Sequence, residues 1–170
     1  MRERYASSLR NAPRVLVGLP YSWPPSQQVM RHTHQVTSVA FSPDGSRIVS
    51  GSEDDNKVRV WNTMTGEKEG ELKGHMAGVK CVTFSHNGLF IVSGSCDCSV
   101  RVWDMSKWET KILLEGHWDI VWSVGISHDD KLLVSGSGDH SVRIWDTNTG
   151  NIIRQAERPS RSGTICRNHS

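Results

Sequence analysis

The sequence lacks any long hydrophobic run. The most apolar stretch near its start, VLVGLPYSW at residues 15–23, is too short and too interrupted for a secretory signal with a cleavage site. No run approaches the length of a membrane span. We therefore expect an intracellular protein, cytoplasmic or nuclear, with no membrane partner.

Net charge is also small. It is +2 at pH 7, too little to indicate a nucleic-acid or membrane surface. Residues 30–150 carry twelve Lys or Arg against sixteen Asp or Glu, whereas residues 1–29 and 151–170 each carry four Arg and one Glu. The mildly acidic body argues against nucleic-acid binding. We interpret the basic ends as solvated tails rather than anion-binding segments.

Cysteines are few: Cys81, Cys96, Cys98 and Cys166. Two of them flank an aspartate in SGSCDCSVRVWD at 93–104, but a zinc site needs four ligands and this pair supplies two. The same stretch recurs without cysteine as SGSGDHSVRIWD at 135–146 and, with one extra residue, as SGSEDDNKVRVWN at 50–62. The aspartate is what repeats, so we expect no metal site and no cofactor.

The repeat extends well beyond this motif. The tryptophans near the end of each copy stand 42 positions apart, and the histidines near the start stand 43 and 42 positions apart. Such a period indicates a repeat architecture. Each copy contains short runs rich in Val, Ile, Phe and Trp that are bounded by turn residues, such as VTSVAFS, SRIVSGS and KVRVWN. With an outer strand such as TKILLEGH, each copy predicts one four-stranded propeller blade.

Glycine closes two of the predicted hairpins, SPDG at 42–45 and SHNG at 85–88, where it accepts a positive φ without strain. In the third copy Asp130 takes the place of this glycine, and Asp accepts the left-handed region better than most residues.

These units resemble WD40 repeats. Two copies carry Gly-His, at 74–75 and 116–117, and two end in Trp-Asp, at 103–104 and 145–146. The first copy departs at both ends, with Arg-His at 31–32 and Trp-Asn at 61–62. The segment VTSVAFSPDGSRIVSGS also resembles the repeat arrays appended to NACHT-type signalling ATPases, although no GxxxxGK[ST] phosphate loop is present.

The expected fold is therefore all-β: a partial, unclosed β-propeller of about three four-stranded WD40 blades. We place the repeats at about 30–73, 74–115 and 116–155, after a linker or partial strand at 1–29 and before an irregular tail at 156–170. Closed propellers have about four to eight blades. We therefore expect a fragment of a larger propeller, a truncated gene product, or a chain that closes only by self-association or with further blades.

A Ser, His, Asp and Trp set recurs at fixed spacing and invites comparison with a catalytic triad. Three equivalent active sites in one short chain are implausible, and the family resemblance implies a structural hydrogen-bonded relay inside each blade instead. The extra residue leaves Asp54 and Asp55 as alternatives in the first copy. The other relay residues are His32, Ser50, Trp61, His75, Ser93, Asp97, Trp103, His117, Ser135, Asp139 and Trp145. We interpret the repeated Arg59, Arg101 and Arg143 as residues that pack and pair between blades.

In this family the end that bears the His loop and the Asp turn commonly binds partners through variable positions. Large aromatics there are typical interface anchors, which singles out Trp118 and Trp122. The weaker candidates are Asp119, Lys80, Met76 and His34. Trp108, expected at the opposite end, is interpreted as incidental.

The leading hypothesis is a non-catalytic, intracellular scaffold that binds a protein or peptide. A second hypothesis is the sensor portion of a NACHT-type signalling ATPase. A third, less favoured, is a hydrolase that uses Ser, His and Asp.

Overall fold

The computed structural model describes residues 30–32 and 34–156. The predicted segment at 1–29 and nearly all of the predicted tail at 156–170 lie outside these residues. The described chain forms three antiparallel four-stranded sheets, in each of which consecutive strands are neighbours. We call these sheets blades 1, 2 and 3. The predicted all-β fold of three unclosed four-stranded blades is confirmed.

Short β-branched and aromatic runs form the strands, and turn residues separate them. Blade 1 contains β1 (Val36–Phe41), β2 (Arg47–Ser52), β3 (Val58–Asn62) and β4 (Lys68–Leu72). Blade 2 contains β5 (Val79–Phe84), β6 (Phe90–Ser95), β7 (Val100–Asp104) and β8 (Glu109–Leu114). Blade 3 contains β9 (Val121–Ile126), β10 (Leu132–Ser137), β11 (Val142–Asp146) and β12 (Ile152–Ala156).

The hairpin turns between the first and second strands have the predicted backbone. Gly45 and Gly88 both have φ +70°, and Asp130 at the equivalent position has φ +58°. Positive φ costs glycine little, whereas Asp130 must be held there by its surroundings.

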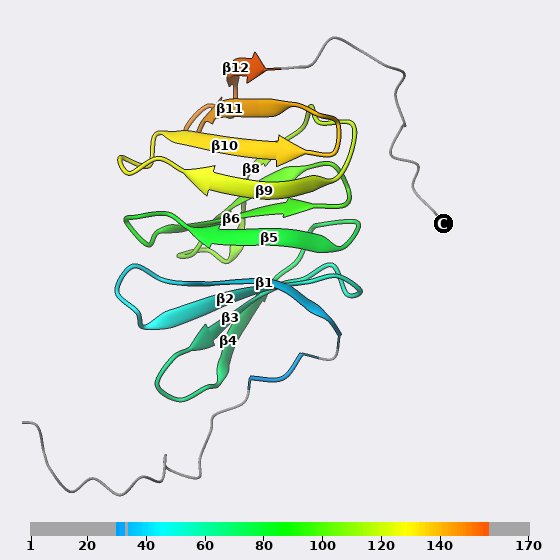
Figure 1. Cartoon of the computed structure of the whole chain (residues 1–170). Coiled ribbons are helices and arrows are strands. Elements are labelled where there is room, and N and C mark those ends of the chain that lie inside the picture. The colour runs from blue at the N-terminus through cyan, green and yellow to red at the C-terminus, as the bar shows by residue number, and fades with distance from the viewer. Residues whose placement is uncertain (1–29, 33, 157–170) are drawn as a thin grey trace, which may run out of the picture.

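The blades stack face to face, so the hydrophobic core lies between them (Figure 1). Buried apolar side chains from β2, β3 and β4 of blade 1 pack against the first strand of blade 2 and against Trp103 in β7. Blade 2 meets blade 3 in the same way, around Trp145. The first junction contains Val49, Val58, Val60, Leu72, Val79, Val82, Phe84, Ile91, Trp103 and Met105; the second contains Val92, Val100, Val102, Leu114, Val121, Leu133 and Trp145.

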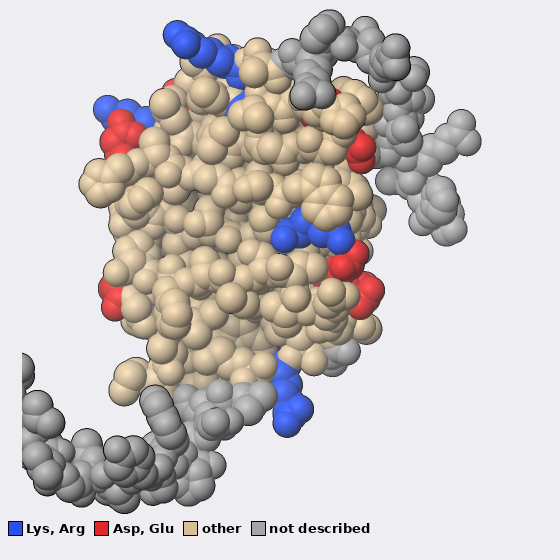
Figure 2. Space-filling view, viewed as in Figure 1, with Lys and Arg blue, Asp and Glu red and all other residues tan. Residues whose placement is uncertain are grey.

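One face of the molecule shows few charged side chains (Figure 2). On the side drawn in Figure 2, small basic and acidic groups lie mainly around the edges, and neutral side chains cover most of the area. No broad basic area faces the viewer, which agrees with the small net charge of the chain.

Candidate functional site

A chain of hydrogen bonds joins four side chains inside blade 2. His75 Nε2 lies 2.7 Å from Ser93 Oγ, and the indole N–H of Trp103 donates to the same oxygen at 2.8 Å. On its other side, His75 Nδ1 lies 2.8 Å from Asp97 Oδ2. A buried indole needs an acceptor, and the serine hydroxyl supplies one.

Blade 3 repeats this arrangement. His117 Nε2 lies 2.7 Å from Ser135 Oγ, which accepts from the Trp145 indole at 2.8 Å. His117 Nδ1 lies 2.7 Å from Asp139 Oδ2. The sequence-predicted residues of these two blades are thus within hydrogen-bond distance of one another.

The two aspartates are stabilised in their charged form. Burial alone would raise the pKa of Asp97, but hydrogen bonds from His75 and Ser99 outweigh it and hold that pKa well below its usual range. Burial likewise acts to raise the pKa of Asp139, and hydrogen bonds from Ser141 and His117 lower it to about 2. Both carboxylates therefore remain ionised acceptors at neutral pH.

Blade 1 departs from this pattern because of the extra residue in its turn. His32 Nε2 still lies 2.6 Å from Ser50 Oγ, and the Trp61 indole donates to that oxygen at 2.7 Å. The other ring nitrogen of His32, however, lies 2.8 Å from Nη1 of Arg59, whose guanidinium pairs with Asp55. Burial, followed by the Arg59 charge, lowers the pKa of His32.

The other alternative in this turn, Asp54, lies 3.7 Å from the exposed His34 ring. Within the described residues, neither aspartate of this turn forms a hydrogen bond with His32; Asp55 contacts the arginine instead.

The expectation that the repeated arginines pair between blades is wrong. Arg59 pairs with Asp55 and Glu71 of its own blade, and Arg101 donates to Thr110 of its own blade at 3.1 Å. Arg143 approaches Asp139 at 3.9 Å, also within one blade. The reason is geometric: the side chain lies along its sheet beside the relay tryptophan, as in Arg101, which stands 5.7 Å from the Trp103 ring centroid.

The relay serines are poorly placed for nucleophilic chemistry. Ser93 and Ser135 have no exposed surface and Ser50 has 3 %. Each hydroxyl already accepts from an indole N–H, in bonds of 2.7 to 2.8 Å. These buried oxygens are therefore not accessible to a substrate carbonyl in this conformation.

The aspartates also hold the loops that follow each relay histidine. Asp97 Oδ2 accepts the backbone N–H of Met76 at 2.9 Å, and Asp139 Oδ2 accepts that of Trp118 at 3.3 Å. The His loops and the Asp turns therefore lie at one end of the sheets. We call this end the His–Asp face.

A β-bulge at the start of the first strand of each blade shapes this face. The strand pairing skips one residue in each case: Thr37 in β1, Lys80 in β5 and Trp122 in β9. A bulge bends the strand and re-aims the extra side chain. Two of these three residues, Lys80 and Trp122, are predicted partner-binding positions. The bulge leaves them outside the strand pairing, which the repeat period alone did not predict.

The bulge residues of neighbouring blades contact one another. Lys80 forms an ion pair with Glu53 of blade 1, and its Nζ lies 5.4 Å from the Trp122 ring centroid of blade 3. The Glu53 hydrogen bond raises the pKa of Lys80, so the amine stays charged. Glu53, which was not among the predicted residues, thus begins a row that crosses all three blades.

Asp119 continues the row beside Trp122. A Cβ at Gly138 would come within 2.9 Å of Asp119 Oδ2 and 3.3 Å of Trp122 Nε1, so both side chains pack against a position that has no side chain. Trp122 remains 54 % exposed. The row of Glu53, Lys80, Trp122 and Asp119 is called the bulge row below.

The remaining predicted residues lie on the same face. Trp118 is 39 % exposed and Met76 is 76 % exposed, each directly after a relay histidine. His34 is exposed next to Asp54. The structure gives no contact that joins Met76 or His34 to the bulge row.

Trp108 is not incidental. Its ring lies against Gly70 in β4 of blade 1, where an added Cβ would come within 2.4 Å of the ring, and it packs on the first core junction. Its backbone has φ +57°, an unusual value for tryptophan. Nothing in the sequence indicated this contact, because it depends on how blades 1 and 2 stack on each other.

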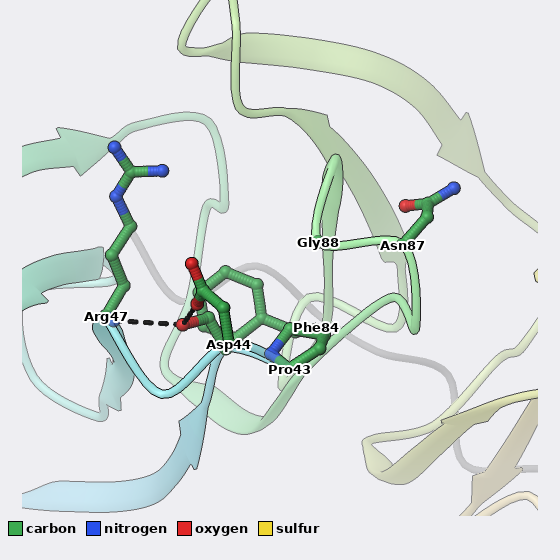
Figure 3. Close-up of a pocket in the computed structure, with 7 residues that line it drawn as sticks. Pro43, Asp44, Arg47, Phe84, Asn87 and Gly88 are labelled. Carbon is green, nitrogen blue, oxygen red and sulfur yellow. Dashed lines mark hydrogen bonds between the residues drawn. The ribbon is translucent and has the colours of Figure 1, made fainter.

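A small pocket lies at the opposite end of the sheets, between the hairpin turns of blades 1 and 2 (Figure 3). Its lining includes Pro43, Asp44, Arg47, Phe84 and Gly88. At the next junction the residue equivalent to Gly88 is Asp130, whose carboxylate accepts the backbone N–H groups of His86 and Asn87 at 2.7 and 2.8 Å. Gly88 has no carboxylate and Pro43 has no N–H, so the same hydrogen bonds cannot form between blades 1 and 2.

Burial disfavours the thiolate form of Cys81 and Cys96. Cys81 and Cys96 are free, and burial raises the pKa of Cys81 to about 12. Over residues 30–32 and 34–156, no group of three or more His, Cys, Asp or Glu side chains is arranged to hold a metal ion. None of the described segments is a helix that could cross a membrane.

Comparisons with known proteins agree with this geometry. Residues 23–62, 66–104 and 108–146 match the family model of the WD40 repeat, described as WD domain, G-beta repeat. The chain is 39 % identical over 85 residues to nuclear distribution protein PAC1 of Yarrowia lipolytica, which covers 49 % of this chain and 19 % of that protein. It is 34 % identical over 76 residues to the guanine nucleotide-binding protein subunit beta-1 of Homarus americanus, which covers 42 % of this chain and 22 % of that protein.

Among solved structures, that of U3-55K superposes with a TM-score of 0.72 at 24 % identity, which covers 76 % of this chain and 41 % of that chain. The matched segments thus span about a fifth of the length of these curated relatives. Proteins of this family generally act as non-catalytic scaffolds for protein partners. With matches in all three blades, the chain belongs to the WD40 repeat family.

Proposed function

We propose that this chain is a non-catalytic scaffold that binds a protein or peptide through its His–Asp face. The observation that carries the proposal is the bulge row: Lys80 and Trp122 are re-aimed by bulges and touch across a blade junction. Rigid strands support these side chains, whereas their identities differ from blade to blade. This combination suits a site for recognition rather than a repeated structural part.

The chemistry of the row favours a partner segment with both apolar and charged groups. Trp122 offers a half-exposed aromatic surface, and tryptophan is a frequent anchor of binding energy at interfaces. Glu53 already forms an ion pair with Lys80. Asp119, at the other end of the row, is the acidic group beside Trp122. An apolar side chain packed on Trp122 with a basic group near Asp119 would match both features.

Support for a non-catalytic role comes from the relay. Its serines are buried and engaged by indoles, and its aspartates hold loop backbone. These groups stabilise the blades on which the bulge row stands. We propose the same role for the relay of blade 1, in which Arg59 stands between His32 and Asp55.

A quantitative pull-down with a matched control tests the proposal. The test variant is Trp118→Ala/Trp122→Ala, and the control is Leu89→Ala, which removes a similarly exposed apolar side chain (58 %) from a hairpin turn at the opposite end. We expect specific partners to be retained by the wild type and the control and lost by the test variant. Equal recovery from all three proteins, with unchanged thermal melting, would contradict the assignment of the site.

A further inference from the structure

The two ends of the blade stack expose apolar surfaces whose equivalents are buried or partly buried at the internal junctions. On blade 1, Val36, Val39 and Phe41 are 43 %, 64 % and 64 % exposed. The equivalent residues of β5, Val79, Val82 and Phe84, are at most 6 % exposed because they pack on blade 1. The first strand of blade 1 therefore exposes the same apolar positions that β5 buries at the first junction.

The far side of blade 3 carries the opposite half of the same junction. Val134 and Val142 are 40 % and 48 % exposed. Their equivalents in the other blades are Val49 and Val58 of blade 1 and Val92 and Val100 of blade 2, all with no exposed surface. Each internal junction thus shows which strand covers this kind of face: the first strand of the following blade.

We propose that two copies of this chain join head to tail, with blade 3 of each copy covering blade 1 of the other. The contact is made twice, so both open faces of both copies are covered. Two copies would give about six blades, within the range of closed propellers. A heterologous contact forms a ring when its rotation closes, and the three blades of the described residues would supply half of such a ring.

The fit at the outer edge of the blades supports this pairing. In the first junction a large residue meets a small one, Trp108 on Gly70. In the second the sizes are reversed: Gly150 faces Ile112, to which an added Cβ would approach within 2.9 Å. By strand register, the corresponding residues of the proposed junction are Gly66 of blade 1 and Arg154 of blade 3. They are again one small residue and one large residue.

A polar position on the open face of blade 3 also has its counterpart. At the first junction Ser38 Oγ accepts the backbone N–H of Val82 at 3.2 Å. Ser123 occupies the equivalent position of β9 and is exposed. In the proposed ring it stands where it can accept the backbone N–H of Val39 from the second copy.

Sedimentation equilibrium on the full chain with complementary charge variants tests the ring. We expect the wild type to have twice the 19.0 kDa mass of the chain. Val39→Asp and Val142→Lys each place a charge in both contacts of a homodimer, which should raise the dimer dissociation constant by at least about tenfold. Both residues are exposed in the single chain, so neither change should disturb its folding, which circular dichroism can verify.

Mixing the two variants provides the sharper measurement. A mixed dimer retains one wild-type contact and places Asp and Lys together in the other, so the dimer mass should reappear. Leu89→Asp, an equally exposed position outside both end faces, should leave the wild-type dimer intact. A monomeric wild type, a dimer insensitive to both end variants, or a continuing series of larger assemblies would each overturn the closed two-copy ring.

Discussion

The indole ring of Trp108 in blade 2 covers Gly70 in blade 1 so closely that a Cβ at position 70 would lie 2.4 Å from its Cζ3 atom. Trp108 belongs to the turn between β7 and β8, and Gly70 to β4. The contact closes the outer edge of the first junction. At the second junction the glycine is on the other side, as Gly150 against Ile112, so the two junctions have different shapes.

Gly70→Ala should therefore destabilise the chain, because the indole must move away from the added methyl. Overpacking of this kind costs about 1–3 kcal/mol. Urea denaturation measures the change. Leu89→Ala, at an exposed hairpin position outside the blade junctions, is the control. The loss should shrink when Gly70→Ala is combined with Trp108→Ala; strictly additive losses would contradict the proposed contact.

Asp139→Ala should cost about 1–3 kcal/mol in the free energy of unfolding, since buried donors on His117 and Ser141 lose their acceptor. The side chain of Asp139 has no exposed surface, whereas that of Asp54 is 59 % exposed. Asp54→Ala is thus the matched control, with an expected loss within about 0.5 kcal/mol. Equal losses in the two variants would count against the relay as a stabilising element.

Asp130→Gly tests the hydrogen bonds that Asp130 accepts from the turn of blade 2. The change relieves a positive φ but removes two hydrogen bonds across the junction. We expect a net loss of about 1 kcal/mol, because bonds to a charged acceptor outweigh the relief of backbone strain. Asp129→Ala is the comparison, because it removes hydrogen bonds within the same turn of blade 3 and none across the junction. A more stable Asp130→Gly variant would show that strain dominates there.

Stability should fall as the pH is lowered through the titration range of histidine. Burial lowers the pKa of His117 below its ordinary 6.5, and burial with Arg59 lowers that of His32. The unfolded chain then binds protons more readily than the folded chain, so stability is greatest above about pH 6.5 and decreases below it. Asp139, with a folded pKa of about 2 against an ordinary 3.8, adds a second loss as the pH falls below about 4.

The urea midpoint measured from about pH 8 to about pH 5 reports the histidine contribution. His117→Gln should flatten this dependence. A slope in His117→Gln equal to that of the wild type would exclude His117 as a source.

The repeat in the sequence predicted most of the fold. Because His, Ser, Asp and Trp recur with one spacing, three copies of one four-stranded unit followed directly, and the blades show those strands. The limits of this reasoning appear where one copy differs from the others. The extra residue in blade 1 let Arg59 stand beside His32, and spacing alone could not choose between Asp54 and Asp55.

By itself the sequence determined the secondary structure and the sheet order of each blade, since these depend on contacts between residues that are close along the chain. Only the tertiary structure decided what happens between blades: Trp108 on Gly70, Asp130 on the turn of blade 2, and Lys80 between Glu53 and Trp122. Those contacts join residues up to about 44 positions apart, and they depend on the bulges and the stacking of the sheets, which leave no periodic mark in the sequence.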